Sequence, residues 1–152
     1  RDLHQSGLLR SILLRSVMWL SRENIARFEV RIGDINYGGH MGNEAALLLF
    51  QDARIRFLES LGFSEKYIGD RAGIILSEAH VYFRREIFLH DELLADVAIA
   101  AVSTSSFELV YSIRRIPDGA EVLNGRTRLI AFDYDRKKVT RLPEAFITAI
   151  RQ

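Results

Sequence analysis

The stretch GDINYGGHMGNEAALLLF, residues 33–50, changes its character halfway along and decides how the chain folds. Four of the residues from 33 to 43 are glycines, which let the backbone take tight turns that side chains would block. From Glu44, apolar residues recur at spacings of three and four as far as Leu61, which predicts a helix that stops at the glycine after it. The first turns are apolar nearly all round, so we expect other structure to wrap this helix. Asn43 is predicted as its N-cap.

Strand-like patterns lie on both sides of this helix. Before it, Phe28, Val30 and Ile32 alternate with charged residues, which is typical of a half-buried strand. After it, four β-like runs are separated by turn residues: 74–88, 93–102, 107–116 and 121–134. A strand, a helix and an antiparallel meander favour an α+β fold, in which a curved antiparallel sheet of about five strands wraps one long central helix.

Composition limits the classes of function. The chain has 152 residues and no cysteine, and 21 Lys and Arg against 20 Asp and Glu give a formal net charge of +1. That length suits one domain. The missing cysteines exclude a disulfide framework, a thiolate zinc site and a cysteine nucleophile. Because the charge is nearly balanced, nucleic acid is not expected as a partner. No spacing of His, Asp and Glu argues for a metal site.

Residues 1–24 form an N-terminal extension before the domain expected at 25–152. The extension is rich in arginine, and its apolar run is too short and too charged to span a bilayer, which takes about 20 mainly apolar residues. Three interpretations stay open: a leader before a natural start at Met18, an amphipathic helix packed on the domain, or, over residues 1–22, an organellar targeting segment. Without targeting, the composition fits a cytoplasmic protein.

Four motifs lie along the chain in a fixed order. They are DINYGGHMGN at 34–43, FQDAR with LG at 50–54 and 61–62, YFRR at 82–85 with Asp91, and LP at 142–143. In this order, over about residues 25–146, they resemble the motifs of the hotdog fold, and more narrowly those of the 4-hydroxybenzoyl-CoA thioesterase branch and its acyl-CoA thioesterase relatives. The resemblance implies an enzyme that hydrolyses an acyl-CoA or acyl-carrier thioester to a free acid. It also implies no cofactor apart from the coenzyme A of the substrate, and a homodimer or homotetramer with active sites at the subunit interface.

The chain departs from that branch at one position. In the hydroxybenzoyl-CoA enzymes the second acid of Asp-x-Asp is the catalytic carboxylate, and the matching residue here is Asn36. An amide cannot act as a nucleophile or a general base, so we expect Asn36 to orient the water or the acyl oxygen. Asp34 shares a strand face with Asn36, and it reaches the same cavity if the strand continues that far.

His40 is the best remaining candidate for the general base, because histidine titrates near neutral pH. In the related plant acyl-carrier-protein thioesterases a histidine occupies a matching loop position, which favours this role. The backbone N–H groups at the start of the helix lie at the positive end of its dipole, where they can hold a developing oxyanion. These are the amides of Met41, Gly42, Asn43 and Glu44. The competing interpretation is that His40 only ties the loop through hydrogen bonds.

Other charged side chains are further candidates. Asp52 lies on the helix, where some hotdog branches carry a catalytic acid; alternatively, it pairs with Arg54 or Arg56. Arg84 or Arg85 is expected to bind the phosphates of coenzyme A. Because adjacent strand residues point to opposite faces, only one of these two arginines should serve the pocket.

Two other functions stay open. The segment from Gly33 to Asn36 resembles the start of the R-specific enoyl-CoA hydratase motif, although His40 falls six residues after Asp34 instead of five. Tyr37 also stands where that motif has a proline. The missing family carboxylate equally admits a non-catalytic hotdog module that binds acyl-CoA. Thiol release would indicate a thioesterase, loss of enoyl absorbance a hydratase, and binding without turnover a module.

Overall fold

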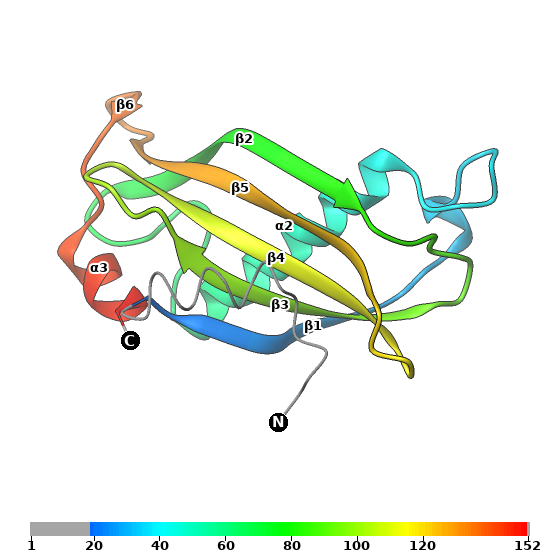
Figure 1. Ribbon diagram of the computed structural model, residues 1–152. Helices are drawn as coiled ribbons and strands as arrows, with labels where there is room; N and C mark the ends of the chain where they lie inside the picture. Colours follow the sequence, from blue (N-terminus) through cyan, green and yellow to red (C-terminus); the bar gives the residue numbers. More distant parts are fainter. Residues whose placement is uncertain (1–18, 152) are drawn as a thin grey trace.

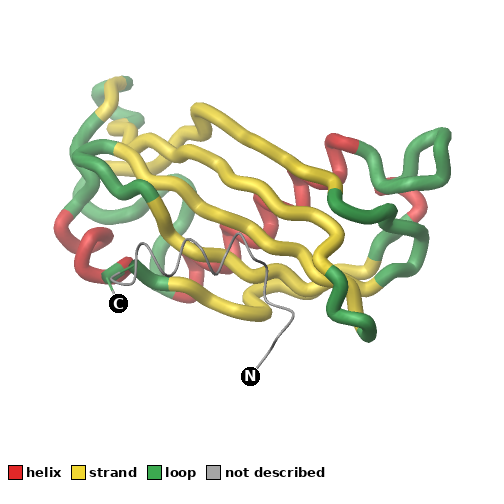
Figure 2. Tube along the Cα trace, viewed as in Figure 1, coloured by secondary structure: helices red, strands yellow, loops and turns green. Residues whose placement is uncertain are grey.

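The computed structural model describes residues 19–151, which form one curved antiparallel sheet with a long helix against one face (Figure 1). In chain order the elements are β1 (Ser21–Glu29), η1 (Ile32–Asp34), α2 (Asn43–Ser60), β2 (Ala72–Phe83), β3 (Glu92–Ala100), β4 (Ser106–Ile116), β5 (Glu121–Asp133), β6 (Lys138–Val139) and α3 (Glu144–Ile150). The strands follow the order β1-β3-β4-β5-β2, and the short β6 pairs with β5. The α+β class and the antiparallel meander are confirmed (Figure 2).

The helix α2 packs on the sheet through one face. Its buried apolar residues are spaced three or four apart and include Ala46, Phe50, Ala53 and Phe57. Leu47 and Leu48 instead point outward and are 43% and 62% exposed, so within this chain the first turns are covered on one side only.

The N-cap of α2 is Gly42, and the prediction of Asn43 for this position is wrong. Gly42 has extended backbone, with φ −79° and ψ 163°, and its carbonyl accepts the first helical hydrogen bond from Ala46 at 3.2 Å. Asn43 is therefore already the first residue inside the helix.

A glycine in β5 allows α2 to approach the sheet closely. A Cβ added to Gly125 would lie 2.8 Å from the ring of Phe50, and closer still to the carbonyl oxygen of His80 in β2. The Phe50 ring stacks on Tyr111 of β4, with centroids 4.3 Å apart. Gly125 thus sets the separation between β5, β2 and the helix.

A buried polar cluster, made of Arg54, Glu65, Tyr111 and Thr127, also holds α2 to the sheet. Arg54 donates from Nε to Glu65 at 2.7 Å and from Nη1 to the Tyr111 hydroxyl at 3.2 Å. That hydroxyl lies 2.7 Å from Oγ1 of Thr127. Burial raises the pKa of Tyr111, so the phenol stays neutral. Burial alone would lower the pKa of Arg54, but Tyr111 and Glu65 outweigh it and raise that pKa.

The first strand differs from its expected bounds at both ends. β1 begins at Ser21, so the sheet includes residues assigned above to the extension. The rest of the extension, residues 1–18, lies outside the described part of the chain, and its three interpretations stay predictions. The strand stops at Glu29, and Ile32 lies in η1. At the other end of the chain, Arg151 forms an isolated antiparallel bridge with Trp19 beside α3.

The second strand ends at Phe83 instead of residue 88. The carbonyl of Val122 accepts hydrogen bonds from the amides of both Arg84 and Arg85, at 2.9 and 3.3 Å. Two successive donors on one acceptor break the alternation of the ladder. The two arginines therefore follow the strand, and the expectation that they point to opposite faces does not apply to them.

Candidate active site

Three segments meet at the end of the sheet opposite α3: the loop before α2, the first turn of α2, and residues 84–91 between β2 and β3 (Figure 1). The loop turns tightly, because the amide of Asn36 donates to the carbonyl of His40 at 2.9 Å and the amide of Gly39 donates to the carbonyl of Asn36 at 3.0 Å. Gly39 has a φ of +80°, which favours glycine. This turn brings Asn36 and His40 beside the start of the helix.

Two of the four amides expected to bind an oxyanion are already engaged. The amides of Met41 and Gly42 donate to backbone carbonyls at 3.1 and 2.9 Å. The helix has no side-chain cap, and within residues 19–151 the amides of Asn43 and Glu44 have no acceptor. They lie at the positive end of an 18-residue helix and are available to a ligand, as is the amide of Ala45, because the first helical hydrogen bond is donated by Ala46.

One side of the helix start borders a cavity of about 440 Å³, here called the asparagine cavity, whose lining includes Asp34, Asn36 and Glu44. Asp34 and Asn36 share this cavity as expected, but the turn η1 brings them together and no strand does. The Asp34 carboxylate accepts a hydrogen bond from the amide of Arg31 at 2.9 Å. The Asn36 side-chain oxygen accepts one from the amide of Gly38 at 3.0 Å.

The other side borders a cavity of about 360 Å³, here called the histidine cavity, whose lining includes His40, Asn43 and the segment after β2. Nδ1 of His40 lies 3.1 Å from a carboxylate oxygen of Glu86, and both side chains are partly exposed. The ring of Phe88 lies against the imidazole, with centroids 5.5 Å apart.

The structure therefore divides the expected catalytic residues between two cavities. Asn36 lines one and His40 lines the other, and residues at the start of the helix line both. Each cavity also includes residues with an unengaged amide: Glu44 and Ala45 line the asparagine cavity, and Asn43 lines the histidine cavity. A group held at the helix start would be within reach of both sides.

Both candidate phosphate-binding arginines line the histidine cavity. The Arg84 guanidinium donates to the side-chain oxygen of Asn124 at 3.2 and 3.3 Å and lies over the ring of Tyr82. The Arg85 side chain is exposed and makes no hydrogen bond or ion pair with residues 19–151. Arg85 is thus the cation available to an anion there.

Asp52 lies away from both cavities, further along α2. Its carboxylate pairs with Arg56 one turn later at 3.3 Å, and both side chains are substantially exposed. This is the ion pair that the sequence offered as the alternative to catalysis.

Glu86 is the site residue that the sequence reasoning missed. It lies in the run 74–88 that the sequence predicted as a strand, and it is far from His40 along the chain. No local signal indicates its contact with His40, because that contact depends on how residues 84–91 fold back over the loop before α2.

Two negative findings concern the described residues only. Within residues 19–151 no group of three or more His, Asp and Glu side chains is placed to hold a metal ion. No helix in this range is long and apolar enough to cross a membrane.

The chain belongs to the Thioesterase-like superfamily, whose family model matches residues 30–150. The fold is the hotdog fold, and family and fold together define the class of the protein, a thioester hydrolase. The resemblance found in the sequence is thereby confirmed. Among curated proteins, no match was found.

Solved structures with the same fold include a 1,4-dihydroxy-2-naphthoyl-CoA thioesterase from Synechocystis, which is 22% identical with a TM-score of 0.76 over 86% of this chain and 96% of that one. A hypothetical protein from Staphylococcus aureus, solved in complex with CoA, is 19% identical with a TM-score of 0.75 over 87% and 82%. A DHNA-CoA thioesterase from Staphylococcus aureus is 20% identical with a TM-score of 0.73 over 84% and 85%. At these identities the likeness concerns the fold.

Proposed function

We propose that this protein is an acyl-CoA thioesterase, which converts a thioester and water into a free acid and CoA. The observation that carries the proposal is the unengaged amide of Asn43, which lines the same cavity as His40, together with the unengaged amide of Glu44, the next residue. The relatives named as CoA thioesterases, and the one holding CoA, support the same substrate class.

In this mechanism the thioester carbonyl lies at the start of α2. His40 takes a proton from water through Nε2, and the water oxygen attacks the carbonyl carbon. The amides of Asn43 and Glu44 hold the oxyanion that forms; one such donor is typically worth ~10²–10³ in rate. When the tetrahedral intermediate collapses, the C–S bond breaks and His40 returns the proton to the thiolate. Asn36 reaches the same carbonyl from the asparagine cavity and orients the acyl oxygen or the water.

In this proposal Arg85 binds the phosphates of coenzyme A, with Arg84 beside it, because guanidinium groups bind phosphate oxygens well. Coenzyme A enters as part of the substrate, and no other cofactor takes part. A cytoplasmic location, which the cysteine-free composition fits, belongs to the same proposal.

We also propose that the protein assembles as a homodimer or homotetramer through the free edge of β2. This strand ends the sheet and exposes Leu76, Tyr82 and Phe83, and Leu47 and Leu48 of α2 are exposed as well. Proteins usually cover an apolar edge strand, and a second copy covers it here. Multi-angle light scattering should give a mass of two or four chains; a single-chain mass would contradict the assembly.

Thiol release from a panel of acyl-CoAs tests the activity, with enoyl-CoA absorbance measured in parallel to detect a hydratase. His40→Ala should lower kcat by ~10²-fold or more, because it removes the general base. His80→Ala is the matched control, since His80 is equally exposed, at 40%, and also pairs with a glutamate. An unchanged kcat in the His40 variant would remove His40 from the mechanism.

Asn36→Asp tests the departure from the family pattern. If the site simply lacks a carboxylate that the chemistry can use, the variant should raise kcat, because it restores a general base in the asparagine cavity. A fall in kcat would show that the amide has its own role.

A further inference from the structure

Residues 84–91, which connect β2 to β3, lie against the loop that carries His40. We call them the Glu86 segment. The Glu86 carboxylate lies 3.1 Å from Nδ1 of His40, and the Phe88 ring packs on the imidazole. Between them, the carbonyl of Ile87 accepts a hydrogen bond from the amide of Met41 at 3.1 Å. The surroundings of His40 on this side come from this one segment.

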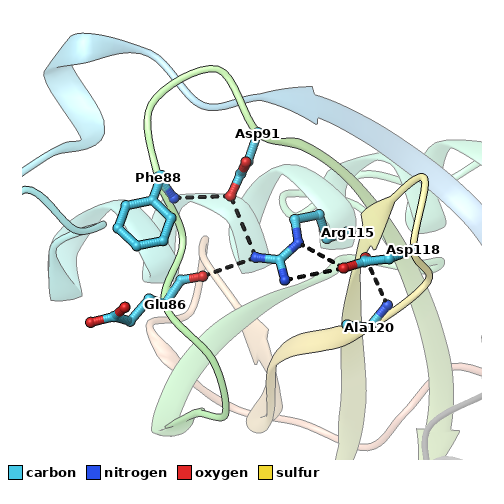
Figure 3. A network of polar contacts seen from close by, with 6 residues as sticks. All are labelled: Glu86, Phe88, Asp91, Arg115, Asp118 and Ala120. Carbon is cyan, nitrogen blue, oxygen red and sulfur yellow. Dashed lines mark hydrogen bonds and ion pairs between the residues drawn. The ribbon is translucent and has the colours of Figure 1, made fainter.

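One arginine from β4 connects the two ends of the Glu86 segment. Arg115 donates from Nη1 to the carbonyl oxygen of Glu86 at 3.1 Å, and the same nitrogen lies 3.6 Å from the carboxylate of Asp91 (Figure 3). The Asp91 carboxylate accepts a hydrogen bond from the amide of Phe88 at 3.0 Å. In Figure 3 the Glu86 side chain points away from Arg115, so the arginine holds the backbone and leaves the carboxylate for His40.

Asp118, in the turn after β4, holds Arg115 from the opposite side. Its carboxylate accepts from Nη2 of Arg115 at 3.2 Å and from the amide of Ala120 at 3.2 Å (Figure 3). The Ala120 amide and then Arg115 lower the pKa of Asp118, so this carboxylate stays charged. The guanidinium is thus fixed between two carboxylates and a carbonyl.

We propose that Arg115 and Asp91 are positioning residues for His40, acting through Glu86 and Phe88. This inference rests on the proposed function, in which His40 is the base. The reason is the exposure of the His40–Glu86 pair, whose side chains are 40% and 62% exposed. Exposed pairs are weak, because holding two mobile side chains in one geometry loses entropy. Fixing the backbone on both sides of Glu86 reduces that loss.

The consequence for the base is a defined tautomer. A charged carboxylate can only accept a hydrogen bond. In the neutral imidazole, Nδ1 therefore carries the hydrogen and donates a hydrogen bond to Glu86. Nε2 is then the unprotonated nitrogen that can accept a proton from water. When the Glu86 segment loosens, the imidazole loses this preference, and a smaller fraction of the enzyme holds a competent base.

The test is Arg115→Gln, with kinetics and ¹⁵N NMR of the His40 side chain. We expect kcat to fall about tenfold with KM little changed, the low end of the effect seen when a hydrogen-bond partner that orients a metal-binding histidine is removed. The NMR signal of the Nδ1–H tautomer should fall with it. Arg126→Gln is the matched control, since Arg126 is an exposed arginine of the neighbouring strand whose ion pair with Glu108 lies away from His40.

A double-mutant cycle with Glu86→Gln separates positioning from a general loss of stability. If Arg115 acts through Glu86, most of its effect on kcat disappears in the Glu86→Gln background. If Arg115→Gln does not fold, Asp91→Asn replaces it, and we expect a smaller change in the same direction. An unchanged His40 tautomer with a lowered Tm, or full additivity in the cycle, overturns the inference. If the wild-type protein releases no thiol, the proposed function fails, but the NMR comparison still decides whether Arg115 positions His40.

Discussion

Glu65→Gln removes one charge from the buried polar cluster that holds α2 and leaves its shape almost unchanged. Removing one partner of a fully buried ion pair destabilises a protein by about 3–5 kcal/mol. The Arg54 and Glu65 side chains are 6% and 29% exposed, and the glutamine oxygen can still accept the hydrogen bond from Arg54. We therefore expect a loss of about 2 kcal/mol in the free energy of unfolding, below that range because Glu65 keeps contact with water.

Urea unfolding measures this loss, and for a chain of this size it corresponds to a fall of about 4–8 °C in Tm. Asp52→Asn is the matched control, because it removes a carboxylate from an exposed i,i+4 pair with Arg56. Such pairs are worth about 0.3–0.5 kcal/mol. If the free energy of unfolding falls by the same small amount in both variants, the cluster does not hold the helix as described. A loss in Glu65→Gln above about 4 kcal/mol would equally contradict the partial exposure used here.

Two further predictions follow from the sheet and its turns. Gly125→Ala should destabilise the protein by about 3 kcal/mol or more, because the new methyl group meets the His80 carbonyl; urea unfolding measures it, and a loss below about 1 kcal/mol would contradict the close approach. Asp118→Asn should lower stability relative to wild type near neutral pH, and the difference should vanish at low pH. The folded-state pKa of Asp118 is lowered, so its contribution is present above the unfolded pKa and is lost as pH falls through the folded pKa, below about pH 4. Urea unfolding of the Asp118→Asn variant and the wild type at pH 7 and pH 3 measures the difference in stability at each pH. An equal difference at the two pH values would contradict the prediction.

The sequence was informative where local pattern decides the structure. The spacing of three and four that runs from Ala45 through Ala53 and Phe57 to Leu61 predicted α2 to within a residue at each end. The alternation in the later runs predicted the strands of the meander, because these strands bury apolar side chains in the core, β2 at its start and the others along most of their length.

The prediction from the sequence was wrong where a backbone group far along the chain determines where a strand ends. β2 ends at Phe83 because the Val122 carbonyl accepts from two successive amides, and nothing in residues 84–88 indicates that. For the same reason, Arg84 and Arg85 could not be assigned to one cavity in advance.

The sequence predicted which segments form the site better than it predicted the contacts between them. The glycine-rich loop before α2 and the amides of its first turn followed from the sequence. The sequence did not show which of these amides are free. The amides of Met41 and Gly42 donate to backbone carbonyls that only the folded chain brings near. The contact between His40 and Glu86 depends on Arg115, a β4 residue that local pattern shows only as an outer-face charge.

The bridge between Trp19 and Arg151 has a practical consequence for how this protein can be handled. The described chain enters and leaves the sheet at the same place, beside α3 and across the molecule from both cavities (Figure 1). A short peptide could join these two points. New chain termini in the exposed turn at residues 135–137 would then give a circular permutant with the same β-ladder. Surface immobilisation through either point would leave both cavities facing the solution.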